Sequence, residues 1–286
     1  MERQNKPAWI TGAGGLIGHY LVQTAPQIAP QWPVRALTRH QLDLLDFDAV
    51  RRAFQHDQPQ LVIHCAAITG IAEAQADPAL AQRVNVGITS LLAELAAEIQ
   101  FVFFSTDLVF DGRTGNYRET DAVNPVHVYG ETKAAAERIV LKNPRHLVVR
   151  TSINGGISLA GNRGFNEQMQ LAWKSGRKIK LFTDEFRCPI FAGETARAVW
   201  ELAAHQCAGM FHVAGAERLS RWQMGQLLAR RWPELKADIE PGSVADFPGP
   251  PRVPDASLDI SKVQNALSRP LPGLTGWLAA NAHEPF

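Results

Sequence analysis

The sequence lacks an excess of charge of either sign, and it lacks a long apolar run. Its 286 residues carry 29 Lys and Arg against 28 Asp and Glu, a formal net charge of +1. Binding to nucleic acid or to an anionic membrane surface normally requires a clustered excess of positive charge. No apolar run approaches the roughly 18 residues that a membrane-spanning helix needs. We therefore expect neither a nucleic-acid partner nor a membrane partner.

Cysteine is also scarce. The chain has three, Cys65, Cys188 and Cys207, without a CxxC pair and without the spacing of metal ligands. An odd and scattered set argues against a disulfide framework, and we expect no metal site. The polar residues 1–6 lack the apolar stretch of a signal peptide, so the sequence predicts a cytoplasmic protein.

Short apolar runs alternate with longer amphipathic runs in the first half of the chain. Such alternation predicts βαβ units, and right-handed crossovers then give a doubly wound parallel sheet, the α/β Rossmann fold. We expect strands at 8–10, 34–38, 61–65, 101–104 and 146–150, and helices near 19–24 and at 47–55, 78–98 and 129–141.

The second half is less regular and predicts a smaller substrate lobe. Four glycines between 155 and 164 indicate a flexible stretch, which is either a lid or a longer loop. We expect a dinucleotide-binding domain at 1–151 with a return segment near 188–214, and a substrate-binding lobe formed by 152–187 and 215–286. Helices are expected at 165–174, 195–204 and 219–231, a strand at 211–213 and a proline-rich loop at 247–254.

A glycine-rich turn lies between the first predicted strand and the first predicted helix. Gly12 permits the tight turn, Gly15 lets the backbone approach a pyrophosphate, and Gly18 lets the helix pack closely on the strand. The helix N-terminus then offers free N–H groups and a partial positive charge to the phosphates. This arrangement predicts a dinucleotide cofactor.

The end of the second predicted strand bears on which cofactor binds. NAD sites often place an acidic residue there for the ribose 2′-hydroxyl. This chain has Arg39, which can pair with a 2′-phosphate; the alternative is a solvated surface arginine. The sequence therefore favours NADP(H), with NAD(H) possible.

Tyr129 and Lys133 are four residues apart at the start of a predicted helix, so their side chains share one face. A phenol with a pKa of about 10 is a poor acid at neutral pH, and a neighbouring ammonium is expected to lower that pKa. Ser105 and Thr106 end a predicted strand, where open α/β sheets place their ligands. These residues predict hydride transfer to a carbonyl, with Tyr129 giving the proton and a hydroxyl holding the carbonyl oxygen.

Several motifs in the correct order resemble the extended short-chain dehydrogenase/reductases, and most closely the dTDP-4-dehydrorhamnose reductase family. The resemblance covers nearly the whole chain. Its motifs are the glycine turn, His64-Cys65-Ala66-Ala67, Asn85, Ser105-Thr106-Asp107-Leu108-Val109-Phe110-Asp111-Gly112, Asn124 to Lys133, and Leu147 to Ser152.

The resemblance implies a role for each matching residue. Thr106, Tyr129 and Lys133 would be the catalytic trio, and Asn85 would be a structural or proton-relay residue behind the lysine. The implied cofactor-binding residues are Gly12, Gly15, Leu16, Ile17, Gly18, Arg39, Asp43, Leu44, Cys65, Ala66, Ala67, Ser105, Tyr129 and Lys133. Family members reduce the 4-keto group of a nucleotide-linked 6-deoxysugar.

The substrate side departs from the family pattern. Leu108 replaces a tyrosine, Ile153 and Asn154 stand where the family has an aromatic platform, and Arg187 replaces a glycine near the expected pocket entrance. Arg187 is either a ligand for a phosphate or carboxylate, or an exposed arginine without a role. Together with Asp107, these residues are the predicted substrate contacts.

The sequence thus predicts an NAD(P)H-dependent reductase of a keto group on a sugar or nucleotide-linked sugar. The alternatives are an epimerase, a dehydratase or a sugar dehydrogenase on the same scaffold, or a non-catalytic nucleotide-binding regulatory subunit. By resemblance, helices 78–98 and 129–141 would pair with their copies in a homodimer.

Overall fold

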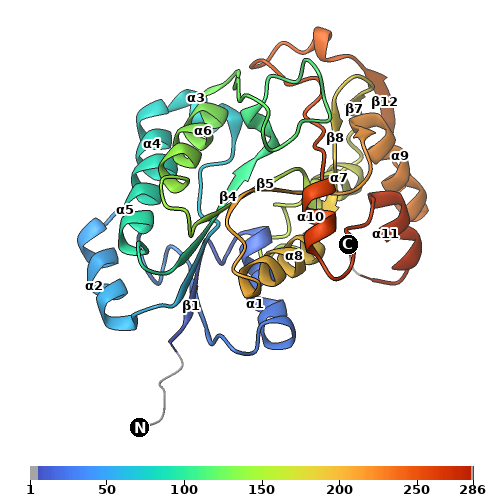
Figure 1. The fold of residues 1–286 in the computed structure, drawn as a ribbon. Helices are drawn as coiled ribbons and strands as arrows, with labels where there is room; N and C mark the ends of the chain where they lie inside the picture. The colour runs from blue at the N-terminus through green and yellow to red at the C-terminus, as the bar shows by residue number, and fades with distance from the viewer. Residues whose placement is uncertain (1–5, 285) are drawn as a thin grey trace.

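A six-stranded parallel sheet forms the centre of the computed structural model, which describes residues 6–284 and 286 (Figure 1). The strand order is β10-β5-β4-β3-β1-β2. Residues 1–5, which belong to the segment expected to lack a signal peptide, lie outside the described residues. The strands are β1 (Ala8–Thr11), β2 (Val34–Leu37), β3 (Leu61–His64), β4 (Gln100–Thr106), β5 (Leu147–Thr151) and β10 (Gly209–Val213).

The inner strands are mostly apolar because helices cover both faces of the sheet. On one face, Ile10 and Ile63 pack with α1 (Leu16–Ile28) and α8 (Ala192–Ala204). On the other face, Trp9 and Val62 pack with α2 (Phe47–Asp57), α5 (Ile88–Leu95) and α6 (Val128–Val140). The predicted doubly wound α/β fold is confirmed.

The predicted helix 78–98 is not one regular helix. It consists of α4 (Pro78–Gln82), a π-helical turn η1 (Arg83–Gly87) and α5, and it ends at Leu95. A short helix that was not predicted, α3 (Ile71–Ala76), precedes it. The first helix is also longer than expected, because α1 starts at Leu16 and continues through Pro26 to Ile28.

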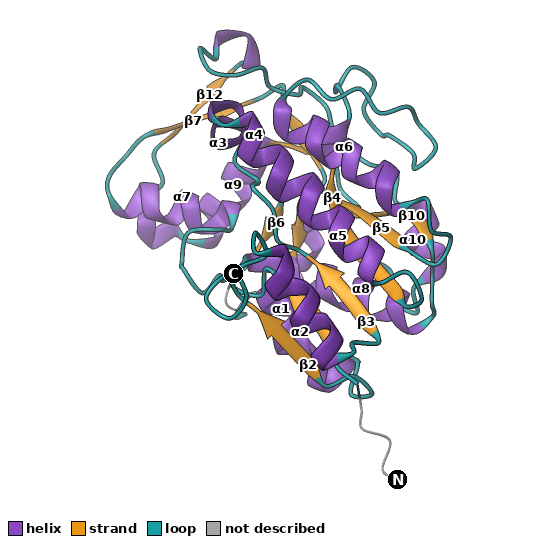
Figure 2. Cartoon of the chain, turned by 90° about the vertical axis from the view of Figure 1, so that its left-hand side faces the viewer, coloured by secondary structure: helices purple, strands orange, loops and turns teal. Residues whose placement is uncertain are grey.

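A second, smaller group of elements has its own core. Phe165, Trp173, Met224 and Trp277 are buried in it. Figure 1 shows these elements on the right-hand side of the molecule, and Figure 2 shows the position of several of them relative to the sheet. They are α7 (Phe165–Lys174), β7 (Ile179–Phe182), α9 (Arg221–Arg231), η3 (Pro233–Leu235), β12 (Ile239–Gly242) and α11 (Leu274–Ala280).

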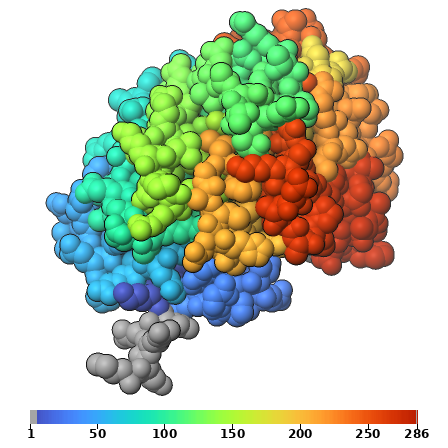
Figure 3. Space-filling view, in the orientation of Figure 1, coloured from blue at the N-terminus to red at the C-terminus, as the bar shows by residue number. Residues whose placement is uncertain are grey.

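Short elements connect this group to the sheet. They are η2 (Asp107–Val109), β6 (Asn154–Gly155), β8 (Phe186–Arg187), β9 (Ile190–Phe191), β11 (Leu219–Ser220), η4 (Val244–Asp246) and α10 (Ser261–Ala266). In the space-filling view, the C-terminal stretch in red lies against earlier parts of the chain (Figure 3). One such contact is a bridge between Tyr117 and Leu258. The domain boundaries given above stay a prediction.

The glycine-rich stretch 155–164 is an ordered loop in the structure. The Glu167 carboxylate accepts hydrogen bonds from the backbone N–H groups of Ser158, Arg163 and Gly164 and from the Ser158 hydroxyl. Asn166 binds both the N–H and the carbonyl of Gly156.

Among the described residues, no helix is long and apolar enough to cross a lipid bilayer.

Candidate active site

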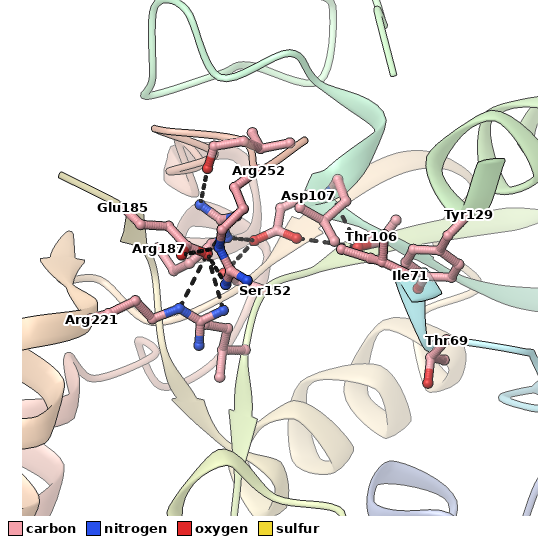
Figure 4. Close-up of a pocket in the computed structure, with 13 residues that line it drawn as sticks. Thr69, Ile71, Thr106, Asp107, Tyr129, Ser152, Glu185, Arg187, Arg221 and Arg252 are labelled. Carbon is pink, nitrogen blue, oxygen red and sulfur yellow. Dashed lines mark hydrogen bonds and ion pairs between the residues drawn. The ribbon is translucent and has the colours of Figure 1, made fainter. Parts of the chain in front are cut away.

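A cavity of about 200 Å³ opens at the carboxyl ends of β3, β4 and β5 (Figure 4). Ligands of open α/β sheets bind at this edge, where the loops that follow neighbouring strands meet. Six of the predicted residues line the cavity: Thr106, Asp107, Leu108, Tyr129, Ile153 and Arg187. The remaining lining residues are Thr69, Ile71, Ser152, Glu185, Arg221, Arg252 and Val253.

The glycine turn has the close contacts that a phosphate-binding turn needs. Gly12 has a φ of +68°, and a Cβ at this position would lie 2.6 Å from the backbone N of Ala66. A Cβ at Gly18 would lie 2.3 Å from the carbonyl oxygen of Gly12. Gly15 is the N-cap of α1 and supplies no side chain to the first N–H groups of the helix. The turn therefore leaves a cradle of backbone N–H groups at Leu16 and Ile17, which fits a pyrophosphate.

The other predicted cofactor residues surround this turn. Ala66, Ala67 and Cys65 follow β3 directly, and Ala66 contacts the turn as described. Arg39 follows β2 and is exposed, and no ion pair involves it within the part of the chain that the structure describes. Asp43 turns its carboxylate back to the N–H of Leu45.

Tyr129 and Lys133 lie on one face of α6 as predicted, and both are buried. The Tyr129 side chain reaches the cavity (Figure 4). Lys133 lies deeper, with its Nζ 4.0 Å from the centre of the Phe103 ring. The His127 side chain caps the helix by accepting a hydrogen bond from the N–H of Gly130, so the first turn that carries Tyr129 is fixed.

The predicted lowering of the Tyr129 pKa by Lys133 is wrong for this structure. Burial raises the pKa of Tyr129, hydrogen bonding with Thr106 opposes the rise, and the negative charge of Asp107 adds to it. Burial also lowers the pKa of Lys133 to about 7, against the opposing effect of Glu137. Desolvation disfavours the charged form of both groups, and the charge of Lys133 is not among the causes of the Tyr129 shift.

Two predicted residues support the site from behind. The Ser105 hydroxyl donates to Glu137 at 2.5 Å, and Glu137 forms a buried ion pair with Arg150 at 2.8 Å. The Ser105 side chain is thus directed into the protein. Asn85, in the π turn, binds the backbone N–H and carbonyl of Ile68 and donates to the Thr132 hydroxyl. It thereby ties the loop after β3 to the turn of α6 that precedes Lys133.

A charge cluster lies on one side of the cavity, and it corrects the interpretation of Arg187 as an exposed arginine. We call the set Glu185, Arg187, Arg221 and Arg252 the arginine cluster. The Arg187 side chain lines the cavity but is only 4% exposed, and it donates to the carbonyls of Phe186 and Val253. Its remaining nitrogens lie 3.2 Å from Glu185 and 3.7 Å from Asp107.

Glu185 holds the arginine cluster together. Arg252 contacts both of its carboxylate oxygens at 2.8 and 3.1 Å, and Arg221 contacts one at 3.3 Å. Burial alone would raise the pKa of Glu185, but Arg221, Arg252 and Arg187 hold that pKa below its usual value. Figure 4 shows the three guanidinium groups converging on this carboxylate, on the far side of Asp107 from Tyr129.

The structure leaves Asn154 out of the cavity. Its side chain accepts from Thr195 and donates to Thr151, so it joins β6 to α8.

Glu185, Arg221 and Arg252 line the cavity but were not among the predicted contacts. The sequence signal for Glu185 was its position two residues before Arg187. Arg221 and Arg252 lie far from Arg187 in the sequence, so no local pattern indicated them.

Among the described residues, no group of three or more His, Cys, Asp or Glu side chains could hold a metal ion.

Comparisons with known proteins identify the family. Residues 8–280 match the family described as the RmlD substrate binding domain. The chain is 32% identical to a probable low-salt glycan biosynthesis reductase, Agl14, of Haloferax volcanii, over 96% of each chain. It is 29% identical to a dTDP-4-dehydrorhamnose reductase of Aggregatibacter actinomycetemcomitans, over 90% of this chain and 92% of that one.

A solved structure shows the same fold. The dTDP-4-dehydrorhamnose reductase of Bacillus anthracis, in complex with NADP, superposes with a TM-score of 0.87 at 23% identity and covers 96% of this chain and 98% of that one. The names of these proteins agree with the predicted reductase activity. This chain belongs to the RmlD family, as its motifs indicated.

Proposed function

We propose that this protein is an NADPH-dependent reductase of a keto group on a nucleotide-linked sugar. The observation that carries the proposal is the joint position of the buried Tyr129 and Thr106 at one cavity, at the sheet edge that also holds the glycine turn. NADPH, when bound in that turn, supplies the hydride. The Tyr129 hydroxyl gives its proton to the carbonyl oxygen, and Thr106 orients that oxygen.

Lys133 acts through charge. As Tyr129 loses its proton, a nearby ammonium stabilises the phenolate, although burial lowers the Lys133 pKa to about 7. Lys133 is also one of the predicted cofactor-binding residues, which fits this role.

Arg39 supports NADPH over NADH. It is exposed at the end of β2, free of ion pairs within the described residues, and thus available to a 2′-phosphate. NADH remains a second donor in this proposal, because the glycine turn binds the pyrophosphate that both cofactors share.

The first test is a titration with NADPH and NADH, followed by NADPH-oxidation assays on dTDP-4-dehydrorhamnose and on free keto sugars. The Tyr129→Phe variant should lose about 10²- to 10⁴-fold in turnover, because it cannot give the proton. Its dissociation constant for NADPH should stay within about threefold of the wild type, since cofactor binding uses the glycine turn.

Tyr117→Phe is the matched control. Tyr117 is equally buried, but its hydroxyl donates to Asp111, away from the cavity. This control should retain turnover. Full activity of Tyr129→Phe would refute the assignment, and tight NADPH binding without turnover on any substrate would favour the regulatory-subunit alternative.

Two further properties belong to this proposal. We propose that the protein acts in the cytoplasm and pairs with a second copy through the predicted helices 78–98 and 129–141, which correspond to α4, η1 and α5 and to α6. Cell fractionation tests the first statement. A monomeric mass by light scattering would contradict the second.

A further inference from the structure

The hydrogen bonds of Thr106 are already fully used without a substrate. Its Oγ1 accepts from the backbone N–H of Leu108 at 3.2 Å and donates to Oδ1 of Asp107 at 3.1 Å. A hydroxyl has a single hydrogen, and a ketone oxygen can only accept. If Asp107 is ionised, its carboxylate and the substrate carbonyl therefore compete for the one hydroxyl hydrogen of Thr106. The Tyr129 oxygen, which is hydrogen-bonded with Thr106, competes for the same hydrogen.

The second oxygen of Asp107 is held by two donors. Oδ2 accepts from the Ser152 hydroxyl at 2.6 Å and lies 3.7 Å from Nε of Arg187. Ser152 Oγ accepts from the N–H of Cys188 at 3.2 Å, which directs the serine hydrogen towards Asp107. A proton on Asp107 must therefore sit on Oδ1, the oxygen that faces Thr106.

We propose that Asp107 is a positioning residue that carries a proton on Oδ1 in the reacting complex. The protonated Oδ1 donates to Thr106, and Thr106 then donates its own hydrogen to the substrate carbonyl. Asp107 takes its proton from water before the cavity is filled and keeps it through the reaction, since Tyr129 gives the proton that the product retains. This inference rests on the proposed reductase function.

The surroundings of Asp107 shift its equilibrium towards the neutral form. The carboxyl is almost completely buried, and burial raises its pKa. Arg187 and Arg221 oppose the rise, but both guanidinium groups are also paired with Glu185. The other titratable neighbours are His127, Tyr129 and Cys188, and burial disfavours the charged form of each.

A neutral Asp107 also serves Tyr129. Its negative charge contributes to the raised pKa of Tyr129, so removing that charge makes the phenol a better acid. The alternative, in which Thr106 turns its hydrogen to the substrate while Asp107 stays ionised, leaves a buried carboxylate oxygen without a donor. Such groups are costly to leave unsatisfied.

Asp107→Asn is the decisive variant, because asparagine copies the neutral acid. Ser152 and Arg187 are both donors, so the amide oxygen should face them and the amide NH₂ should donate to Thr106. In wild type, kcat should fall as pH rises through the Asp107 pKa, which lies above its usual range. In Asp107→Asn this fall should be absent, so that kcat no longer depends on pH over that range.

Two further variants sharpen the pH profile. Ser152→Ala removes a donor to the ionised form, which raises the Asp107 pKa and should move the fall in kcat to higher pH. Asp111→Asn is the matched control, since Asp111 binds Tyr117 and Asn124 outside the cavity. It should keep the wild-type profile.

Infrared difference spectra of the NADPH complex between about pH 5 and about pH 9 decide the proposal independently of turnover. A protonated carboxyl band should appear in wild type and Asp111→Asn and be absent in Asp107→Asn. Absence of that band in wild type overturns the inference, as does an unchanged fall in kcat in Asp107→Asn or Ser152→Ala. A failure of wild type to reduce any keto sugar would instead refute the proposed function.

Discussion

The glycine turn and the arginine cluster are two parts of the candidate site that are built on different physical principles. The turn contains no charged side chain, and its shape follows from the positive φ of Gly12 and the close approach of Gly18 to Gly12. The cluster packs four charged side chains together, with Glu185 only 1% exposed. The glycine turn depends on the conformations that its backbone can adopt. The arginine cluster depends on charges that are stable in the interior only while each keeps its partner.

Glu185→Gln tests the cluster and should have the largest effect. It removes the carboxylate that three arginines share, so it should lower the free energy of unfolding by about 3–5 kcal/mol. Urea denaturation measures this change. Glu98→Gln is the control, because the Glu98–Arg145 pair is exposed and should contribute less than about 1 kcal/mol. Equal effects of the two variants would show that the cluster is not held by Glu185.

Gly18→Ala tests the turn. The added Cβ would meet the Gly12 carbonyl oxygen at 2.3 Å, and backbone must move to make room. We expect a loss of about 1–3 kcal/mol in unfolding free energy, together with weaker NADPH binding. Gly14→Ala lies in the same turn with its nearest contact at 3.7 Å, so it should change both quantities little. Normal NADPH affinity in Gly18→Ala would contradict the proposed cradle.

Arg39→Ser should have the smallest effect and sharpens the comparison, because it removes a side-chain contact from a surface otherwise made of backbone. NADPH affinity should fall roughly tenfold, equal to about 1.4 kcal/mol, while NADH affinity should not change. Fluorescence titration with both cofactors measures it. Arg52→Gln, on the exposed side of α2, is the control. Equal losses for NADPH and NADH would remove Arg39 from cofactor choice.

The same contrast explains how much of the fold and site the sequence predicts. Apolar runs such as Leu61–His64 and Phe101–Phe104 predict the sheet because burial on both faces is a local compositional signal. The glycine turn and the Tyr129–Lys133 pair are local patterns as well, and both lie as predicted.

Features decided by distant contacts were missed. Arg187 can be buried because its charge is paired with that of Glu185, and because the carbonyl of Val253, 66 residues later, accepts its hydrogen bond. The π turn at Arg83–Gly87 places Asn85 against the backbone of Ile68, 17 residues earlier. No periodicity within residues 78–98 encodes that partner. The pKa of Tyr129 was likewise misjudged because its desolvation depends on the whole fold around it.

The last strand of the sheet has a consequence for how the chain can be divided. β10 pairs along all of β5, yet it follows β5 by almost sixty residues, and α8, which covers one sheet face, lies between them. A fragment ending at residue 151 would leave β5 as an open apolar edge and Ile10 and Ile63 without their cover, a combination that promotes aggregation. During synthesis, too, the first half must wait for residue 213 before its sheet is closed, so the cofactor-binding half should be obtainable only as part of the longer chain.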